Sequence, residues 1–323
     1  MEAIAKTEDI LKKVRENVAE VIIGKEEVVT LILASLAAGG HVLLEDVPGT
    51  GKTVLAKALA KSMDFKFGRV QFTPDLLPSD VTGLSYFNQE KGSFVFKEGP
   101  VFANLLLADE INRATPRTQS SLLECMAEGQ VTVDGKTRIL DAPFFVIATQ
   151  NPVETIGCFP LPEAQKDRFL MKISMGNLTE KEERELIDRY IKEEPLQRIS
   201  SVCSIEEVRE LQKTCSNVFV HEDLRDYIVA LVQASRKISE SQESAGILGG
   251  VSPRGTLALL RASQGYAMVC GRDYIVPEDI KKVAIPVLAH RLLAEDSSEE
   301  QKNTFINGLL QSIPLPTEDW MRP

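Results

Sequence analysis

The sequence predicts an α/β unit with a mainly parallel sheet, followed by a unit made of helices. From Val42 to about Ile173, short apolar runs alternate with helical patterns, which is typical of βαβ units. Beyond this stretch the strand signal fades and helical periodicity continues alone. The chain of 323 residues is long enough for two packed units. We therefore place one seam near residue 177, between residues 1–177 and 178–323.

Five apolar runs are predicted to form the strands of one sheet. Helical patterns separate them, and a crossover helix returns the chain to the same edge, so neighbouring strands are expected to be parallel. The expected strands cover residues 41–45, 66–72, 104–109, 143–149 and 170–174. The expected helices cover residues 25–38, 53–63, 115–128 and 162–169, and an amphipathic helix is expected at the N-terminus.

Two insertions into this alternation are predicted to be β-hairpins. Residues 84–98 carry alternating aromatic side chains on both sides of a Lys91-Gly92 turn. Residues 130–140 contain VTVDGKTRIL, with Asp134-Gly135 at the expected turn. Both hairpins interrupt the α/β pattern without replacing any of its strands.

Five amphipathic helices are predicted after the seam. Thr179 followed by Glu182 forms a capping-box start, and Pro277 suits a first helical turn. We interpret the Ser-Ser-Glu-Glu run at 297–300 as a short polar connection. The five helices are expected at 179–192, 205–216, 221–240, 253–270 and 277–293.

The composition argues against several classes of protein. Lys and Arg total 37 against 47 Asp and Glu, and the net charge of −10 offers no bulk attraction to nucleic acid or anionic lipid. No window approaches the roughly 18 apolar residues of a membrane span, and the N-terminus lacks the apolar core of a signal peptide. The five cysteines and three histidines show no paired spacing, so neither a disulfide framework nor a zinc site is expected. We expect a soluble, cytoplasmic protein.

The first expected strand runs into DVPGTGKT and then into a helix, which is the context that a P-loop (Walker A motif) requires. Lys52 would reach the β- and γ-phosphates of ATP, and the Thr53 hydroxyl would bind Mg²⁺. The usual first glycine is Asp46 here, a departure that puts the nucleotide affinity in question. A chance glycine-rich turn is the competing interpretation, and the strand and helix on either side argue against it. The expected nucleotide contacts in the loop are Pro48, Gly49, Thr50, Gly51, Lys52, Thr53 and Val54.

Polar residues follow two further expected strands. ANLLLA ends in Asp109-Glu110, and parallel strands present such ends to the ligand crevice. Asp109 would hold Mg²⁺, and Glu110 would orient and deprotonate the attacking water. APFFVIAT leads to Asn151, which could hydrogen-bond the γ-phosphate and that water. Solvated turns are the alternative interpretation for both sites.

These motifs together resemble the MoxR family of AAA+ ATPases, and their order covers nearly the whole chain. The resemblance implies a five-stranded AAA+ core, a C-terminal helical lid and assembly into a ring, usually a hexamer. The two hairpins look like the helix-2 and pre-sensor-1 inserts that MoxR proteins share with magnesium chelatase ATPase subunits and minichromosome-maintenance helicases. The motifs are the P-loop, LLLADEINR at 105–113, ATQNP at 148–152, LPEAQKDRF at 161–169 and VSPRG at 251–255.

The resemblance also implies roles for single residues. Asn151 would be sensor 1, Arg168 an arginine finger for the neighbouring subunit's ATP, and Arg254 a sensor 2 that reaches ATP from its own lid. A guanidinium can bridge phosphate oxygens at both arginine positions, although a surface ion pair is the plain alternative. Arg113 competes with Arg168 for the intersubunit role.

Residues before the P-loop are expected at the adenine ring. Ile23 and Gly24 sit where AAA+ proteins contact the base, and an apolar side chain beside a glycine suits a flat ring, although core packing would explain them equally well. Gln71, at the end of the second expected strand, could sense nucleotide through Glu110, although a polar strand end is the commoner explanation.

The function that follows is ATP hydrolysis that drives chaperone-like maturation of a separate partner protein. The resemblance implies that this partner often carries a von Willebrand factor A domain. A nucleic-acid motor, a magnesium chelatase motor subunit and a nucleotide-gated scaffold remain as alternatives. The acidic charge and the few basic residues on the hairpins speak against the nucleic-acid motor.

Overall fold

The computed structural model describes residues 2–45, 49–151, 158–239, 247–294, 298–317 and 320. Its centre is a sheet of five strands in the order β2-β5-β8-β1-β9, and every pair of neighbours is parallel. The five predicted strands are confirmed, with ends that shift by one or two residues. The strands are β1 (Val42–Glu45), β2 (Phe67–Gln71), β5 (Leu105–Asp109), β8 (Phe145–Gln150) and β9 (Met171–Ile173).

The register of these strands gathers polar residues at one edge of the sheet. Gln71 of β2 lies opposite Asp109 of β5, and Glu45 of β1 lies opposite Gln150 of β8. All four residues end their strands, so this carboxyl edge carries polar side chains next to the loop that follows β1. The fold therefore brings the ends of chain-distant strands together, as the crevice of a parallel sheet requires.

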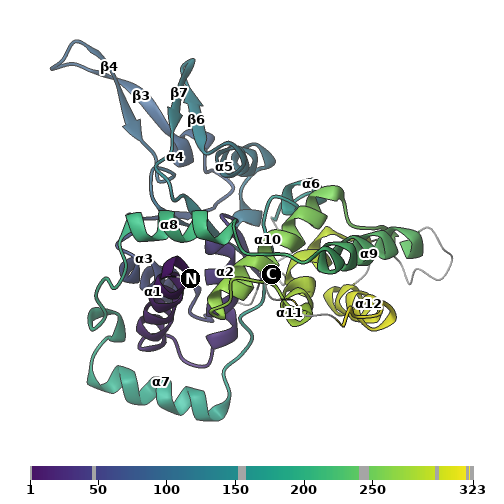
Figure 1. Ribbon diagram of the computed structural model, residues 1–323. Helices are drawn as coiled ribbons and strands as arrows, with labels where there is room; N and C mark the ends of the chain where they lie inside the picture. The colour runs from purple at the N-terminus through teal and green to yellow at the C-terminus, as the bar shows by residue number, and fades with distance from the viewer. Residues whose placement is uncertain are drawn as a thin grey trace.

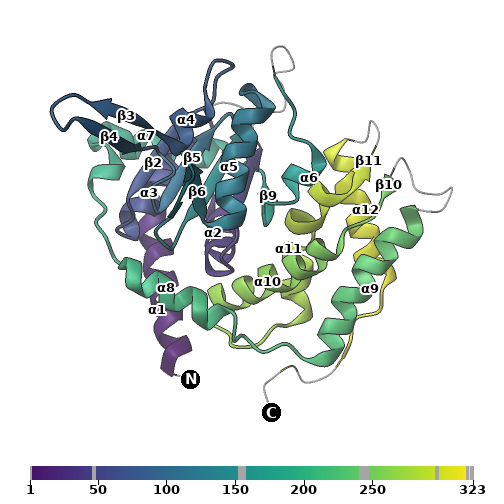
Figure 2. The ribbon, with the colours of Figure 1, turned by 90° about the horizontal axis from the view of Figure 1, so that it is seen from above.

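Alternate residues of the central strands enter two different cores. Leu105 and Leu107 of β5 join a large core with α1, α2 and α3, whereas Leu106 and Ala108 join a smaller core with α5. Helices therefore cover both faces of the sheet, which explains the continuous apolar runs of its strands (Figure 2). The helices are α1 (Glu2–Ala19), α2 (Glu26–Ala37), α3 (Lys52–Ser62) and α5 (Pro116–Glu128).

Helix α6 (Glu163–Lys166) is shorter than the predicted helix over 162–169. The segment after Lys166 turns toward β9, and its carbonyls are bound from outside the helix. Arg291 donates to the carbonyls of Asp167 and Phe169 at 3.1 and 2.6 Å. This long-range contact replaces the helical hydrogen bonds that the local sequence would favour.

The two predicted hairpins are confirmed, and both project from the α/β unit (Figure 1). Asp134 and Gly135 have φ values of 54° and 71°, which is the backbone geometry of a tight two-residue hairpin turn. The Arg138 guanidinium lies 3.7 Å from the centre of the Phe96 ring and so links the two hairpins. The hairpin strands are β3 (Gly83–Asn88), β4 (Ser93–Glu98), β6 (Gln130–Val133) and β7 (Lys136–Ile139), and a short α4 (Pro78–Thr82) precedes β3.

The helices predicted after the seam are confirmed, and a sixth, α12 (Glu299–Ser312), is added. The interpretation of 297–300 as a mere connection was wrong, because Ser298 caps α12 and accepts a hydrogen bond from the Gln301 amide at 3.2 Å. The last predicted helix ends early, since the chain turns at Ala289–Arg291 into β11 (Leu293–Ala294), which pairs with β10 (Ile247–Gly249). The other helices are α7 (Glu180–Lys192), α8 (Ile205–Cys215), α9 (Glu222–Ser239), α10 (Pro253–Val269) and α11 (Pro277–Leu288).

The helices after the predicted seam do not all lie together. Helices α7 and α8 lie on the α/β unit: Arg189 donates to the Ala19 carbonyl at 2.6 Å, and Gln212 to the Leu36 carbonyl at 2.8 Å. Helices α9, α11 and α12 group on the other side (Figure 2). Helix α10 packs along α2, where a Cβ on Gly265 would lie 2.2 Å from the Ala34 oxygen. The seam near residue 177 stays a prediction about domains.

All five cysteines are free. Within the part of the chain that the structure describes, no group of three or more His, Cys, Asp or Glu side chains is placed to hold a metal ion. No described helix is both long enough and apolar enough to cross a bilayer.

Candidate active site

The loop between β1 and α3 has the backbone geometry of a phosphate cradle. Gly49 and Gly51 have φ values of 89° and 87°, in the left-handed region that favours glycine. Gly51 caps α3, which begins at Lys52 and leaves its first amide groups at the positive end of the helix dipole. The expected Pro48 contact and the unusual Asp46 lie outside the described residues.

A hollow of about 400 Å³ opens between this loop and the carboxyl edge of the sheet. We call it the phosphate hollow. It brings together residues that the sequence analysis had selected from three separate motifs: Lys52 and Thr53, Asp109 and Glu110, and Asn151. Its full lining is Gly49, Gly51, Lys52, Thr53, Val54, Arg69, Gln71, Asp109, Glu110, Thr149 and Asn151.

Both carboxylate oxygens of Asp109 accept hydrogen bonds. The Thr149 hydroxyl donates to Oδ1 at 2.7 Å, and the Arg69 guanidinium donates to Oδ2 at 2.8 Å. The Asp109 side chain is 14% exposed, so the carboxylate is half enclosed but still reaches the hollow. Oxygen ligands of this kind, with the Thr53 hydroxyl, suit Mg²⁺ held together with phosphate oxygens.

Glu110 adopts a left-handed backbone conformation, with φ 55° and ψ 50°. Such a conformation is unusual for a residue with a side chain and costs on the order of 1–3 kcal/mol. Its amide donates to the Thr149 hydroxyl at 2.8 Å. Its Oε2 accepts hydrogen bonds from Gln71 at 2.8 Å and from Arg113 at 3.1 Å. The strained turn therefore directs a carboxylate into the hollow and two neighbours hold it there.

Asn151 follows β8 and is buried, with 5% of its surface exposed. Its backbone oxygen accepts a hydrogen bond from the Asn112 side chain at 3.3 Å, which ties the end of β8 to the segment after Glu110. The side chain lines the phosphate hollow.

A second hollow of about 780 Å³ adjoins the first and shares Gly49, Gly51 and Val54 with it. We call it the base hollow. Ile23, which is 6% exposed, lines it together with Thr50. On the far side the lining comes from helix α7 and the segment after β9: Met175, Gly176, Asn177, Leu178, Glu183, Leu186, Ile187 and Tyr190. The mostly apolar wall suits a flat, weakly polar ring.

Gly24 lies beside the base hollow but does not line it. Its φ of 65° strains any residue with a side chain, and a Cβ there would lie 2.1 Å from Glu182 Oε1, which would have to move. The next residue, Lys25, donates to the carbonyls of Gly176 and Asn177 at 3.1 and 2.9 Å. The glycine thus allows α7 to lie close to the segment before α2, and Ile23 lines the base hollow.

Arg168 and Arg254 line neither hollow. Arg168 donates to the Leu123 carbonyl. The Arg254 side chain is 61% exposed and its NH1 lies 3.7 Å from Asp167 Oδ2. The buried Arg291 Nε donates to Asp167 Oδ1 at 2.7 Å. We call Asp167, Arg168, Arg254 and Arg291 the arginine cluster.

The expected reach of Arg254 to the ATP of its own chain is therefore not seen in the structure. Arg254 stands in the first turn of α10. That turn lies beside the end of α6, where Arg254 contacts Asp167. Arg113, the rival intersubunit arginine, is engaged with Glu110 of its own chain.

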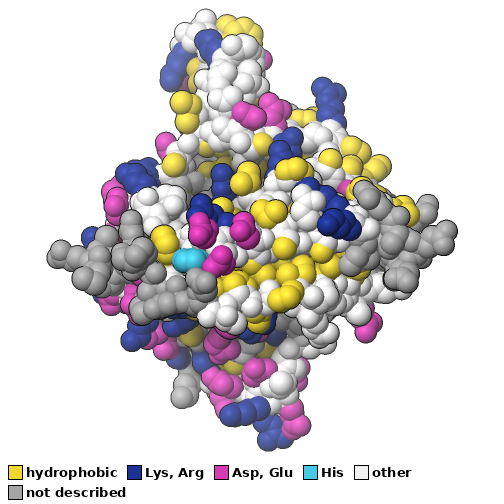
Figure 3. Space-filling model, turned by 45° about the vertical axis from the view of Figure 1, so that its right-hand side comes forward, with side chains coloured by type: hydrophobic (Ala, Val, Ile, Leu, Met, Phe, Trp, Pro, Cys, Tyr) yellow, Lys and Arg dark blue, Asp and Glu magenta, His cyan; other side chains and the backbone are white. Residues whose placement is uncertain are grey.

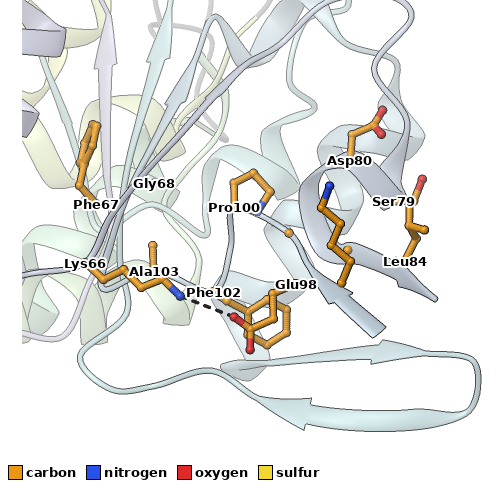
Figure 4. A pocket seen from close by; sticks show the side chains of 13 residues that line it. Lys66, Phe67, Gly68, Ser79, Asp80, Leu84, Glu98, Pro100, Phe102 and Ala103 are labelled. Carbon is orange, nitrogen blue, oxygen red and sulfur yellow. Dashed lines mark ion pairs between the residues drawn. The ribbon is translucent and has the colours of Figure 1, made fainter. Parts of the chain in front are cut away.

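A further hollow of about 500 Å³ lies at the base of the first hairpin, where β2 meets β4 (Figure 4). Lys66, just before β2, pairs with Glu98 at the end of β4 at 3.5 Å. Gly68 permits the close approach, because a Cβ there would lie 2.6 Å from the Pro100 oxygen. The strand that carries Arg69 and Gln71 to the phosphate hollow is thus anchored to a hairpin at its other end.

The sequence analysis missed Arg69 and Thr149 as members of the site. Arg69 stands two residues before Gln71, so side-chain alternation along β2 puts both on one face. That spacing was the signal that could have found it. Thr149 had no such signal, because its hydroxyl reaches Asp109 and Glu110 only once β8 is placed beside β5.

The chain matches known proteins over most of its length. A family model described as "ATPase family associated with various cellular activities (AAA)" matches residues 41–171, and an "AAA lid domain" matches 239–307. The chain is 41% identical to "Chaperone MoxR1" of Mycobacterium tuberculosis, covering 98% of this chain and 85% of that protein. It is 32% identical to "Protein MoxR" of Paracoccus denitrificans, with 92% and 93% covered. A crystal structure from Cytophaga hutchinsonii, assigned as an ATPase, superposes with a TM-score of 0.90 at 41% identity over 98% of both chains.

Proposed function

The chain belongs to the MoxR family of AAA+ ATPases, and we propose that it hydrolyses Mg²⁺-bound ATP in the phosphate and base hollows. The observation that carries this proposal is the convergence of Lys52, Thr53, Asp109, Glu110 and Asn151 on one hollow. These groups come from three strand ends, and their chemistry matches the needs of phosphoryl transfer: a cation, oxygen ligands, a base and an amide.

The chain's own residues divide this work. The amides of the P-loop and Lys52 bind the phosphates, while Thr53 and Asp109 hold the metal. Held by Thr53 and Asp109, Mg²⁺ would supply positive charge that neutralises the charge developing on the phosphates. Ile23 and the apolar residues of α7 receive the adenine ring.

Glu110 is the proposed general base. Its carboxylate orients the attacking water and accepts its proton, and Asn151 holds the same water and the γ-phosphate. Gln71 and Arg113 both donate to Glu110 Oε2, which leaves Oε1 for the water. Gln71 therefore controls where the base points.

Arg168 and Arg254 are proposed to act on the nucleotide of a neighbouring subunit. The support is their position: both belong to the arginine cluster, neither lines its own chain's hollows, and Arg254 is exposed. A ring, hexameric in the family's usual form, would place this cluster against the next subunit's γ-phosphate. The hydrolytic site would then be complete only in the assembly, with the arginines stabilising the transition-state charge.

The ring is proposed to remodel a separate client protein in the cytoplasm, including clients with a von Willebrand factor A domain. One relative is named a chaperone. The hairpins protrude from the body and carry apolar side chains at their surface (Figure 3). Phe94 is 75% exposed and Ile139 is 81% exposed, on different hairpins. Such side chains offer a client protein an apolar contact. Movement of the hairpins during the nucleotide cycle would displace the bound client.

Replacing Glu110 by Gln tests the proposal. The Glu110→Gln chain should bind ATP with unchanged affinity while hydrolysis falls about 10²-fold or more, because the amide cannot accept the water's proton. Binding is measured with a fluorescent ATP analogue and hydrolysis by phosphate release. Glu124→Gln, an exposed carboxylate on α5, is the matched control and should change neither. Unchanged turnover in Glu110→Gln would refute the assignment.

A further inference from the structure

Arg69 forms an ion pair with Asp109, the carboxylate proposed to hold the metal. Its guanidinium lies 2.8 Å from Asp109 Oδ2, and its side chain, 46% exposed, lies along the wall of the phosphate hollow. The other oxygen, Oδ1, accepts the Thr149 hydroxyl at 2.7 Å. Thr149 is itself fixed by the Glu110 amide. Each oxygen of Asp109 thus accepts one hydrogen bond, and a metal bound at Oδ2 would meet the guanidinium of Arg69.

Two cations cannot share this oxygen without repulsion. A guanidinium and a divalent ion at one carboxylate oxygen would stand within about 4 Å of each other, where unscreened like charges repel strongly. The guanidinium is half exposed on an edge strand, so it can swing away at little cost. Its second contact, Gln71 Oε1 at 3.1 Å, offers a place to remain bound after leaving Asp109.

We propose that Arg69 is a positioning residue that exchanges places with Mg²⁺ at Asp109 when nucleotide binds. In the nucleotide-free chain it holds Asp109 in the orientation that the metal requires. Once displaced, it keeps its hydrogen bond to Gln71, whose amide nitrogen donates to Glu110 at 2.8 Å. The arrival of the metal is thereby transmitted to the general base through two side chains of one strand. The inference rests on the proposed function, because it takes Asp109 as the metal-holding carboxylate.

The alternatives make different predictions about metal dependence. If Arg69 bound a phosphate, its removal would weaken nucleotide binding with and without Mg²⁺. If the ion pair were only structural, its removal would lower the stability and leave the metal dependence of binding unchanged. If Arg69 and Mg²⁺ exchange places, removing Arg69 strengthens nucleotide binding when Mg²⁺ is present. When Mg²⁺ is absent, removing Arg69 leaves nucleotide binding unchanged or weaker.

The test measures the dissociation constant of ADP for the full chain in Mg²⁺ and in EDTA, and the Mg²⁺ concentration that gives half-maximal binding. Arg69→Met should tighten binding roughly threefold to tenfold in Mg²⁺ and lower the half-maximal Mg²⁺ concentration to match, the range expected for loss of one competing charged hydrogen bond. In EDTA its affinity should equal the wild-type value or fall below it. Arg69→Lys keeps the charge and should return toward wild type.

Two further variants make the result specific. Lys66→Met removes a nearby exposed cation that pairs with Glu98 and should leave both dissociation constants unchanged. In a chain that also carries Asp109→Asn, Arg69→Met should no longer change ADP binding in a Mg²⁺-dependent way. The asparagine has no carboxylate for which Arg69 and Mg²⁺ could compete. A tightening that persists without Asp109, an equal weakening in both buffers, or an unchanged Mg²⁺ dependence overturns the proposal.

Failure of this inference is distinguishable from failure of the proposed function. If wild type binds ADP and Asp109→Asn reduces its Mg²⁺ dependence, the metal assignment stands, and an inert Arg69→Met then overturns the exchange alone. If Asp109→Asn leaves the Mg²⁺ dependence intact, the metal role of Asp109 fails and the exchange fails with it. A thermal melt of each variant confirms that the chain is folded before binding is measured.

Discussion

The phosphate hollow is built from polar pairs that remain partly open to solvent, whereas the arginine cluster is anchored by a guanidinium that is almost fully buried. Arg69 and Asp109 are 46% and 14% exposed, but the Arg291 side chain is only 2% exposed. Arg291 bonds the Asp167 carboxylate and the carbonyls of Phe169 and Leu170. Burial lowers its pKa to about 10, and the carboxylate of Asp167 opposes that shift.

This difference shows how one chain can serve two sites. The residues of the hollow must rearrange when a charged ligand enters, so their pairs are exchangeable. The residues beside Arg168 are instead held by the buried guanidinium of Arg291, which bonds the Asp167 carboxylate and the carbonyls of Phe169 and Leu170. We expect the phosphate hollow to act on nucleotide within its own chain and the arginine cluster to act on a neighbouring subunit, and the following variants distinguish the two.

The largest expected effect is on Arg168. Arg168→Ala should reduce hydrolysis about 10³-fold, the range of an arginine finger, while leaving ATP binding unchanged. Mixing this chain with a Lys52→Ala chain should restore part of the activity, because some interfaces then combine an intact P-loop with an intact finger. Arg117→Ala, an exposed arginine on α5, is the control. If stable mixed rings form and phosphate release does not recover, Arg168 does not act on the nucleotide of a neighbouring subunit.

The next effect is on stability. Arg291→Met should lower the free energy of unfolding by about 3–5 kcal/mol, because it leaves a half-buried carboxylate and several carbonyls without their donor. Chemical denaturation measures the change. Arg184→Met is the matched control, since Arg184 and its partner Glu180 are 76% and 81% exposed; it should cost less than about 0.5 kcal/mol. Similar losses of unfolding free energy in both variants would show that Arg291 does not anchor the arginine cluster.

Lys52→Ala is expected to act on the other region. It should weaken ATP binding about 10²-fold, through the loss of a charge-assisted contact to the phosphates, without disrupting the fold. Equilibrium binding and a thermal melt measure the two quantities. Lys57→Ala, an exposed lysine on the same helix, should leave both unchanged. If Arg168→Ala weakened binding as much as Lys52→Ala does, the two regions would not be separate.

The smallest effect concerns His41, a buried histidine just before β1, at the end of the sheet opposite the phosphate hollow. Burial lowers the pKa of His41 to about 4, while its ring bonds the Met126 carbonyl and the Val146 amide at 3.1 Å each. The unfolded chain binds a proton near pH 6.5 and the folded chain does not until about pH 4. The contribution of neutral His41 to the unfolding free energy is therefore fully present above pH 6.5, and it is lost as the pH falls toward 4.

Between pH 7.5 and pH 5 this one histidine should cost about 2 kcal/mol of unfolding free energy. Denaturation series at both pH values measure the loss. His41→Gln should be less stable at neutral pH but should show a smaller decrease on acidification. The arginine cluster has its own buried histidine, His290, whose pKa is also lowered by burial and by Arg291. If the unfolding free energy of His41→Gln falls with pH as much as that of the wild type, the loss on acidification would be assigned to the region around His290.

The sequence could predict those features that depend on short stretches of chain. The strands, the two hairpin turns and the P-loop each carry a local pattern, so their places were found within one or two residues. The meeting of Lys52, Asp109 and Asn151 also followed, because parallel strands end at one edge.

Features that depend on long-range packing could not be predicted. The length of α6 is set by Arg291, more than a hundred residues away in the chain. The contact of Arg254 with Asp167 joins the first turn of α10 to the end of α6, two segments that are far apart in the chain. The Thr149 hydroxyl reaches Asp109 and Glu110 only when β8 lies beside β5.

Helix α7 gives the base hollow a wall that is incompletely packed. Ile187 and Tyr190 line that hollow although 59% and 45% of their surfaces are exposed. An adenine ring between them and Ile23 would cover apolar surface from two separate segments of the chain. A base bound there would add roughly 25 cal/mol per Å² of covered apolar area to the docking of this helix. Affinity for the base and local folding stability of α7 are in that sense one and the same free energy.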